Sequence, residues 1–470
     1  MPDIIKKIII FFIIGGLAVS AYFMGYINFL KSVPRTTDEV VYYTMARQMD
    51  DNIFAYNTTG FALQDLLNEG KRYPEYFHRP LFKHPPLFTL MIVGAVKIFG
   101  PSSVAASLAG LMCWALAIMV VYLLGSAVGG RAVGLLAAGF MFMDPVTIMS
   151  SQKVWMDTPL MFFMLLTVYA YWMGVSRNKS WFFLLGGAAA GAAFLIKYPG
   201  LLSFFAIILF ILLRFPKIFR NRYFLVSLFL PFLMALPWFT LNYYVYGTGF
   251  IYEQFAVHGM TNLFSPKVLF MLAVGLGIAF LGWRALRDPE GAVQRFDRLF
   301  SGRFVSYMKW AGFIGTAVFL IAYAGRSLNV FEVPWVTWRQ GLFSGQPRWF
   351  YFQRLLRFCF LYGFSYLAFF DPFFKKDDGR FLLKLNAFLI IVFFAAWGNF
   401  QCRYILPALP FLMILSVDYA WRILGRLGRI DSVVLRLLLQ SAVLVLIVLA
   451  VNKTMLINVV VSYTNNMCYF

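Results

Sequence analysis

The sequence predicts an all-α polytopic membrane protein, and two observations support this fold class. Hydrophobic residues make up 61% of the 470 residues and charged residues only 13%, a composition typical of a chain that lies mostly within a bilayer. Apolar stretches of about 17 to 25 residues, the length that crosses a hydrocarbon core, recur from near the N-terminus to near the C-terminus. We therefore expect a single membrane domain over residues 1–470, without a large soluble domain.

The first apolar stretch, residues 8–30, follows Lys6 and Lys7 and contains small residues at 18–21 that are typical of a signal-peptide cleavage site. The apolar run continues well beyond these residues and is long enough to span a membrane. A retained anchor is therefore the preferred interpretation, and cleavage is the alternative.

Twelve further apolar stretches follow the anchor, which gives about 13 predicted transmembrane helices. They cover residues 103–125, 132–150, 159–176, 181–196, 199–213, 223–245, 267–283, 304–324, 352–370, 381–398, 404–421 and 434–451. Residues 86–99 are apolar but too short to span comfortably. We predict that they form a helix that enters the outer leaflet and returns.

Lysine and arginine residues predict the orientation, because short cytoplasmic loops hold an excess of them. With the N-terminus inside, the basic residues collect in the inner segments, and the short outer turns hold little more than Lys153, Lys197 and Arg403. The same distribution explains much of the formal net charge of +21. Charge dispersed over inner loops fits anionic lipid and argues against nucleic acid as a partner.

This orientation makes residues 31–85 the first extracytoplasmic loop, with seven acids and seven basic residues. Loops of this length inside compact architectures are usually functional. Other predicted outer segments lie on the same side of the membrane: residues 150–157, 246–265, 325–351 and 399–403. We therefore expect an extracytoplasmic active site.

Four segments in chain order carry a resemblance to a known family. They are TDEVVYYTMARQM at 37–49, FKHPPLF at 82–88, WMDTPLMFF at 155–163 and CRYILPALP at 402–410. Together they resemble the type C membrane glycosyltransferases that use polyprenyl-phosphate sugars, in the branch that contains protein O-mannosyltransferases and the lipid A aminoarabinose transferase. The resemblance implies the type C glycosyltransferase fold, with juxtamembrane helices in the 31–85 loop. Residues 266–398 match only as apolar stretches.

Two adjacent acids, Asp38 and Glu39, stand where the chain leaves the first apolar stretch. In the family the acid at this position is catalytic, which carries over to Asp38 with Glu39 as its neighbour. A carboxylate within hydrogen-bond reach can accept the proton of an attacking hydroxyl, and the resemblance implies inversion at the anomeric carbon. The same residues also fit a capping box opened by Thr36. We favour catalysis for Asp38 and capping for Glu39.

Asp157 precedes Thr158 and Pro159 at the outer end of a predicted crossing. The resemblance makes it a candidate for a second active-site carboxylate, which orients the acceptor or the first acid. The alternative is an ordinary acid at a helix N-terminus, ahead of a proline in the first turn. The two interpretations stay open.

A lipid-linked donor has a phosphate leaving group, which cations at membrane level can stabilise. Lys83 is the leading candidate, because the lysine of this motif contacts donor phosphate in the aminoarabinose-transferase branch; an interfacial lysine is the alternative. The resemblance makes His84 a hydrogen-bonding residue of the donor site. The planar guanidinium of Arg403 suits a phosphate, although an interfacial anchor explains it equally well.

No cofactor is required by this chemistry, and metal-type spacing is weak. The candidate divalent-metal ligands on the predicted outer face are Glu75, His78, His84, Glu253 and His258, and none of them has strong ligand spacing. Asp418 and Arg422 lie four residues apart in a predicted crossing, and we expect them to neutralise each other.

The sequence thus predicts a multi-pass glycosyltransferase of the cytoplasmic membrane, a hexosyl- or pentosyltransferase. Its partners are a polyprenyl-phosphate-linked sugar donor, an extracytoplasmic protein, lipid or polysaccharide acceptor, and membrane lipids. The alternative is a transporter or lipid flippase, which is expected to carry ionisable residues near the midplane in broken helices, often in repeated halves. Here the acids cluster at one membrane face, and the sequence has no visible internal repeat.

Overall fold

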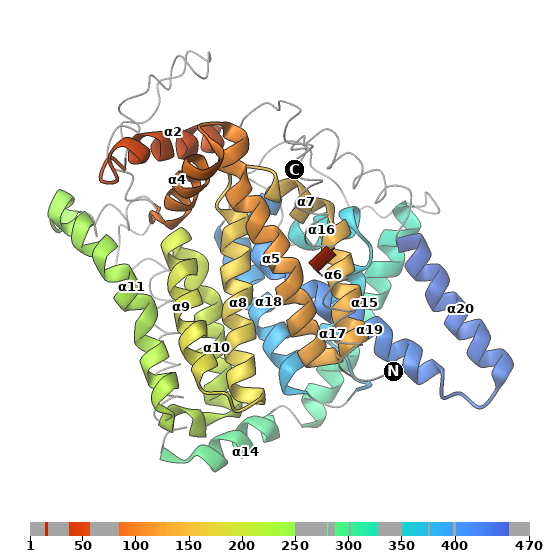
Figure 1. Cartoon of the computed structure of the whole chain (residues 1–470). Coiled ribbons are helices and arrows are strands. Elements are labelled where there is room, and N and C mark those ends of the chain that lie inside the picture. The colour runs from red at the N-terminus through yellow and green to blue at the C-terminus, as the bar shows by residue number, and fades with distance from the viewer. Residues whose placement is uncertain are drawn as a thin grey trace, which may run out of the picture. The chain divides into compact units, whose positions relative to one another are not determined.

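The computed structural model describes residues 15–16, 37–56, 84–249, 280, 287–299, 302–327, 350–374, 377–397 and 401–450. Every regular element within these ranges is helical (Figure 1). The chain divides into two compact units. Unit 1 comprises residues 1–21, 118–149 and 294–470, and unit 2 comprises residues 22–117 and 150–293.

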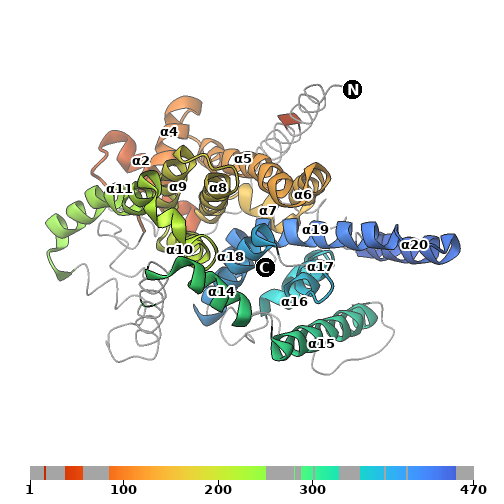
Figure 2. The same cartoon turned by 90° about the horizontal axis from the view of Figure 1, so that it is seen from below.

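Unit 2 holds most of the sequence motifs. Its helices are α2 (Thr37–Asp51), α4 (Leu87–Phe99), α8 (Asp157–Ser176), α9 (Trp181–Ile196), η2 (Tyr198–Gly200), α10 (Leu201–Arg214), η3 (Pro216–Arg220) and α11 (Arg222–Tyr246), with the first half of α5 (Ser103–Gly129) and the start of α14 (Pro289–Leu299). Figure 2 shows α8, α9 and α10 side by side and nearly end-on.

The centre of this bundle is an aromatic cluster around Tyr171 of α8. Its ring lies 5.9 Å from Phe183 of α9, 6.2 Å from Phe204 of α10 and 6.1 Å from Phe224 of α11, measured between ring centroids. The Tyr171 hydroxyl donates a hydrogen bond to Ser227 Oγ at 2.9 Å. Aromatic packing and a satisfied buried hydroxyl therefore hold four successive helices together.

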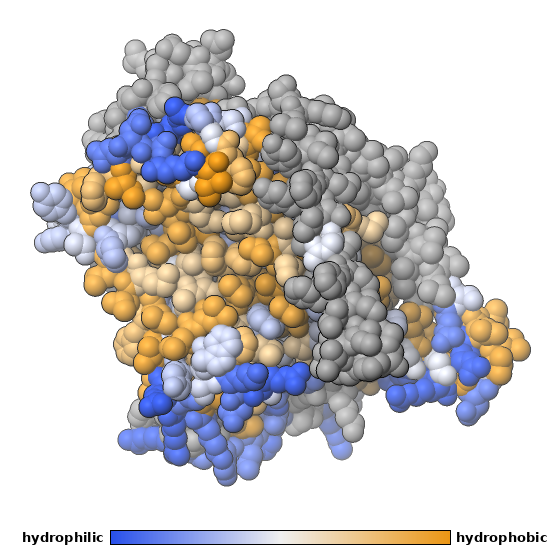
Figure 3. Space-filling model, viewed as in Figure 1, coloured by the Kyte–Doolittle hydropathy of each residue, from blue (hydrophilic) through white to orange (hydrophobic). Residues whose placement is uncertain are grey.

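Short connections make α8 to α11 run alternately up and down, so their ends form two groups. Asp157 and Lys197 lie at one end. The opposite end holds the basic residues Arg177, Lys179, Arg214, Lys217, Arg220 and Arg222. Between the ends, hydrophobic residues cover the outward sides of α5, α9 and α11 (Figure 3). Such an apolar belt with unequal ends is typical of helices that cross a bilayer.

Unit 1 contains the remaining helices. They are α6 (Arg131–Met143), α15 (Arg303–Ser327), α16 (Phe350–Phe358), α17 (Tyr362–Phe369), α18 (Asp378–Trp397), η4 (Cys402–Ala408), α19 (Leu409–Leu427) and α20 (Val433–Ala450), together with the second half of α5 and most of α7 (Pro145–Ser151) and α14.

Two predicted crossings in unit 1 are broken helices. The axes of α6 and α7 differ by 61°, and the break falls at Asp144, which is fully buried. Its carboxylate accepts hydrogen bonds from Thr147 N and from the Tyr362 hydroxyl, both at 2.8 Å. The stretch 352–370 likewise forms two helices, α16 and α17. A break in a helix leaves backbone polar groups without their helical hydrogen-bond partners, and in an apolar environment these groups need other partners within the protein. The Asp144 carboxylate is such a partner, because it accepts from Thr147 N.

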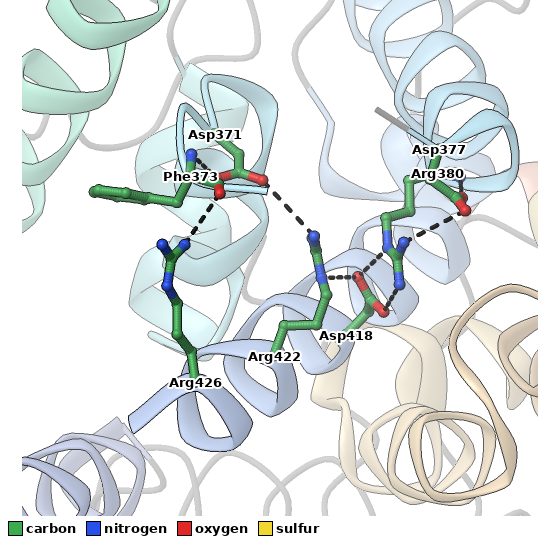
Figure 4. A network of polar contacts seen from close by, with 7 residues as sticks. All are labelled: Asp371, Phe373, Asp377, Arg380, Asp418, Arg422 and Arg426. Carbon is green, nitrogen blue, oxygen red and sulfur yellow. Dashed lines mark hydrogen bonds and ion pairs between the residues drawn. The ribbon is translucent and has the colours of Figure 1, made fainter. Parts of the chain in front are cut away.

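A charged network ties α19 to the chain around the start of α18 (Figure 4). Asp418 is buried and accepts from Arg380 Nε at 2.8 Å and Nη2 at 2.9 Å. The expected pair with Arg422 is confirmed, with Nε 2.9 Å from Asp418 Oδ2. Arg422 Nη1 also lies 3.7 Å from Asp371. The partner that sequence spacing did not predict is Arg380, which is 38 positions away.

Six described helices are long and apolar enough to cross a membrane, or seven if α6 and α7 form one bent span. The count of 13 is therefore not confirmed. The predicted spans 8–30 and 267–283 lie outside the described residues apart from Gly15, Gly16 and Phe280. The α4 helix matches the one predicted at 86–99, and its course in the membrane stays a prediction.

Candidate active site

The two acids of the first motif lie in the first turn of α2, where negative charge favours a helix. This confirms the helix that the sequence predicted there. Asp38 is half-buried and Glu39 is buried. The buried face of α2 packs on α4, with the Tyr42 ring 5.4 Å from that of Phe88. The two adjacent acids are thus held differently, since only Asp38 keeps part of its surface exposed.

Glu39 reaches a segment far along the chain. Its Oε1 accepts a hydrogen bond from Val154 N at 3.1 Å, and its Oε2 lies 4.0 Å from Lys153 Nζ. The backbone of Thr36, which the capping box requires, lies outside the described residues. Glu39 therefore connects α2 to the chain that leads into α8.

Asp157 is the first residue of α8 and is buried. Its Oδ1 lies 2.9 Å from Lys197 Nζ, and the Lys197 side chain is 15% exposed. Lys197 follows the last residue of α9, so two neighbouring helix ends supply a charge-assisted hydrogen bond. The sequence motifs did not identify Lys197 as a site residue. Only its position could have indicated a role, because it is one of few basic residues in the predicted outer turns.

His84 lies in a short element that Tyr56 secures. The Tyr56 hydroxyl donates to His84 O at 2.8 Å and to Pro85 O at 3.3 Å. Burial raises the pKa of Tyr56 well above its usual value, so the hydroxyl keeps its proton and remains a donor. The imidazole of His84 lies 6.2 Å from the Tyr42 ring between centroids. The His-Pro-Pro element is therefore attached to both α2 and the residues that follow it.

Unit 2 brings Asp38, Glu39, His84 and Asp157 to one end of the bundle. Figure 1 shows α2 and α4 crossing this end, where α5 and α8 begin. Lys83, directly before His84, lies outside the described residues, as do Glu75, His78, Glu253 and His258. Within the described ranges, no group of three or more His, Cys, Asp or Glu side chains is arranged to hold a metal ion.

Arg403 belongs to unit 1, in the 3₁₀ helix η4. Its Nε donates to Gln401 Oε1 at 2.6 Å, and its guanidinium carbon lies 5.4 Å from the Tyr404 ring centroid. The guanidinium is half-buried and oriented by these local contacts. Its predicted part in binding phosphate stays a prediction.

A comparison with protein families found a match that lies almost wholly in the first half of the chain. Residues 83–240 match the family model described as dolichyl-phosphate-mannose-protein mannosyltransferase. This segment, about a third of the chain, is similar to that family. The match includes the His-Pro-Pro element, Asp157 and Lys197, and it confirms the family resemblance found in the sequence motifs. No curated protein sequence matches the chain.

Solved structures of the same fold cover nearly the whole chain. ArnT from Cupriavidus metallidurans in the apo state is 14% identical with a TM-score of 0.54, over 96% of this chain and 75% of ArnT. The Archaeoglobus fulgidus oligosaccharyltransferase tethered with an acceptor peptide is 17% identical with a TM-score of 0.55, over 96% of this chain and 55% of that enzyme. AglB from the same organism, in complex with an inhibitory peptide and a dolichol-phosphate, is 14% identical with a TM-score of 0.52 and is covered to 56%. This chain thus has the fold of membrane glycosyltransferases and spans about half the length of the archaeal proteins.

Proposed function

We propose that this protein transfers a sugar from a polyprenyl-phosphate or polyprenyl-diphosphate donor to a hydroxyl of an extracytoplasmic acceptor, with inversion at the anomeric carbon. One observation carries the proposal: the acids of α2 and the buried Asp157–Lys197 pair lie at the same end of unit 2, and that pair falls within the mannosyltransferase match. A dolichol-phosphate in the archaeal AglB structure supports a lipid-linked donor.

The acceptor side of the reaction involves the two carboxylates. Asp38 is half-buried, so it keeps exposed surface toward an incoming acceptor and accepts the proton of the attacking hydroxyl. Asp157 is buried against Lys197 and orients the acceptor or the first acid. The acceptor is a protein, a lipid or a polysaccharide, and the transferred group is a hexose or a pentose.

The donor side of the reaction involves cations. Lys83 directly precedes in sequence the element that Tyr56 holds through the carbonyls of His84 and Pro85. Positive charge from Lys83 stabilises the negative charge that develops on the leaving phosphate, and Arg403 is the second candidate for this role. His84 hydrogen-bonds the donor. No metal ion is needed for these steps.

We further propose that the enzyme lies in the cytoplasmic membrane with its N-terminus inside. The basic residues at the end of unit 2 opposite Asp157 support this orientation, because cytoplasmic loops collect lysine and arginine. The acids of α2 and the Asp157–Lys197 pair then face the outside. The acceptor therefore approaches from the extracytoplasmic side.

A transfer assay with purified protein tests the proposal. Radiolabelled polyprenyl-phosphate and polyprenyl-diphosphate hexoses and pentoses are offered in nanodiscs together with protein, lipid and polysaccharide acceptors, and both the labelled acceptor and the released polyprenyl phosphate or diphosphate are measured. Asp38→Asn is expected to lose about 100-fold to 10,000-fold in rate, the usual contribution of a general base, and Asp157→Asn is also expected to lose activity. Asp51→Asn, an exposed acid at the far end of α2, is the matched control and keeps full activity.

The transporter alternative predicts a different outcome when the protein is reconstituted in liposomes. Movement of intact, uncleaved donor between the leaflets of liposomes, without release of polyprenyl phosphate from any donor, would assign the protein to transport. Unchanged transfer by Asp38→Asn would remove that residue from the reaction.

A further inference from the structure

The chain between α7 and α8, residues 152–156, is a buried segment without helical structure. Val154, Trp155 and Met156 are all buried. Helix α5 packs behind the start of this segment, since a Cβ atom on Gly110 would lie 3.2 Å from Ser151 O and 3.4 Å from Lys153 O. Buried backbone groups outside regular structure need partners. The backbone polar groups of this segment therefore need hydrogen-bond partners on the side that faces away from α5.

Helix α2 provides contacts to this segment. Glu39 Oε1 accepts a hydrogen bond from Val154 N at 3.1 Å. The Tyr42 hydroxyl donates a hydrogen bond to Met156 Sδ at 3.8 Å. Glu39 and Tyr42 are three residues apart and so share one face of the helix. Two hydrogen bonds from one face of α2 thus hold residues 154 and 156 in place.

A buried pair of opposite charges accompanies these contacts. The side chains of Glu39 and Lys153 are each only 3% exposed, with Oε2 and Nζ 4.0 Å apart. A buried charge is costly unless an opposite charge compensates it. Glu39 is therefore the counter-charge that makes burial of the Lys153 ammonium tolerable.

We propose that Glu39 and Lys153 are a positioning pair, which sets Asp38 relative to Asp157 and takes no part in proton transfer. Glu39 directly follows Asp38, and Val154 stands three residues before Asp157. The pair therefore joins the two short stretches of chain that carry the two acids. This inference rests on the proposed function, because it concerns the geometry of that reaction.

Three variants separate positioning from catalysis. Glu39→Gln keeps an oxygen that accepts from Val154 N but leaves Lys153 as an uncompensated buried charge. Lys153→Met removes the ammonium that lies 4.0 Å from Glu39 Oε2. The double variant removes both charges and keeps the acceptor oxygen. Replacing a whole buried ion pair is often neutral, whereas removal of one partner is strongly unfavourable.

Sugar transfer and hydrogen exchange are measured for each variant at equal amounts of folded protein. Each single variant is expected to lose about tenfold to 100-fold in kcat, the effect of a small displacement of reacting groups. The KM for the donor and the shape of the pH profile remain those of the wild type. Amides of α2 lose protection in both single variants, and the double variant recovers most of the kcat and the protection.

The outcomes are distinct. A double variant no more active than Glu39→Gln means that Glu39 itself reacts, and wild-type kcat in the single variants means that the pair positions nothing. If the wild-type protein transfers no sugar, the proposed function fails, while the exchange measurements still decide whether the pair holds α2. The matched control is the exposed pair Lys217 and Glu290 at the other end of unit 2, whose neutralisation leaves kcat and α2 exchange unchanged.

Discussion

Replacement of Asp418 by alanine tests the energetics of the charged network in unit 1. Asp418 is only 2% exposed and accepts hydrogen bonds from Arg380, at 20% exposure, and pairs with Arg422, at 16%. Its removal leaves two largely buried guanidinium groups. Their remaining acidic partners are more distant, with Asp377 3.4 Å from Arg380 and Asp371 3.7 Å from Arg422.

The size of the effect follows from burial. Removing one partner of a buried ion pair costs about 3 to 5 kcal/mol, because the other charge stays desolvated. The distant contacts to Asp371 and Asp377 recover only part of this, since exposed or long ion pairs contribute little. Asp418→Ala is therefore expected to lower the free energy of unfolding by about 3 kcal/mol or more.

Thermal unfolding and SDS titration of purified protein in mixed micelles measure this change. The control is Glu290→Gln, which removes an equally short ion pair from an exposed position and is expected to change stability too little to detect. Equal stability of Asp418→Ala and the control would refute the reasoning, because burial would then have no effect on the worth of the pair.

Four further changes follow from the same structure. Lys197→Met should lower kcat for sugar transfer by a larger factor than it changes the KM for the donor, since it removes the ammonium that lies 2.9 Å from Asp157. An unaltered kcat contradicts a role for this pair. Tyr56→Phe should raise the KM for the donor and lower stability by about 0.5 to 1.5 kcal/mol, the worth of one hydrogen bond, and calorimetry with donor titration checks both effects. Lys83→Ala should weaken donor binding by about 1.5 to 3 kcal/mol, and Lys83→Arg should keep part of the donor affinity. Unchanged donor affinity in Lys83→Ala would mean that this lysine is an interfacial residue only. Cysteines introduced at Asn57 and Asn178 should react with an impermeant thiol reagent in intact cells at position 57 alone, and labelling only at 178 overturns the orientation.

Among the candidate site residues, the sequence identified the acids and missed their partners. Asp38, Glu39 and Asp157 stand in motifs that a single sequence displays. Lys197 is 40 positions from Asp157, and Val154 is 115 positions from Glu39. Spacing along one helix predicts contacts only three or four residues apart. These longer pairings depend on which helices pack against each other.

The sequence by itself determined where most of the described helices lie. Residues 181–196 were predicted and observed with the same limits as α9, and residues 103–125 fall within α5. Such elements follow from local properties, because a long apolar segment in a bilayer must satisfy its backbone internally and a helix does so within the segment.

Only the tertiary structure decided where apolar segments break and which charges meet. Residues 132–150 are apolar enough to read as one crossing, yet α6 ends before Asp144, whose carboxylate meets Tyr362 of α17. The buried carboxylate of Asp418 is likewise shared by Arg380 and its own helix neighbour Arg422. The physical reason is that a buried polar group must find a partner wherever packing provides one, and hydropathy measures only the affinity of a segment for the bilayer.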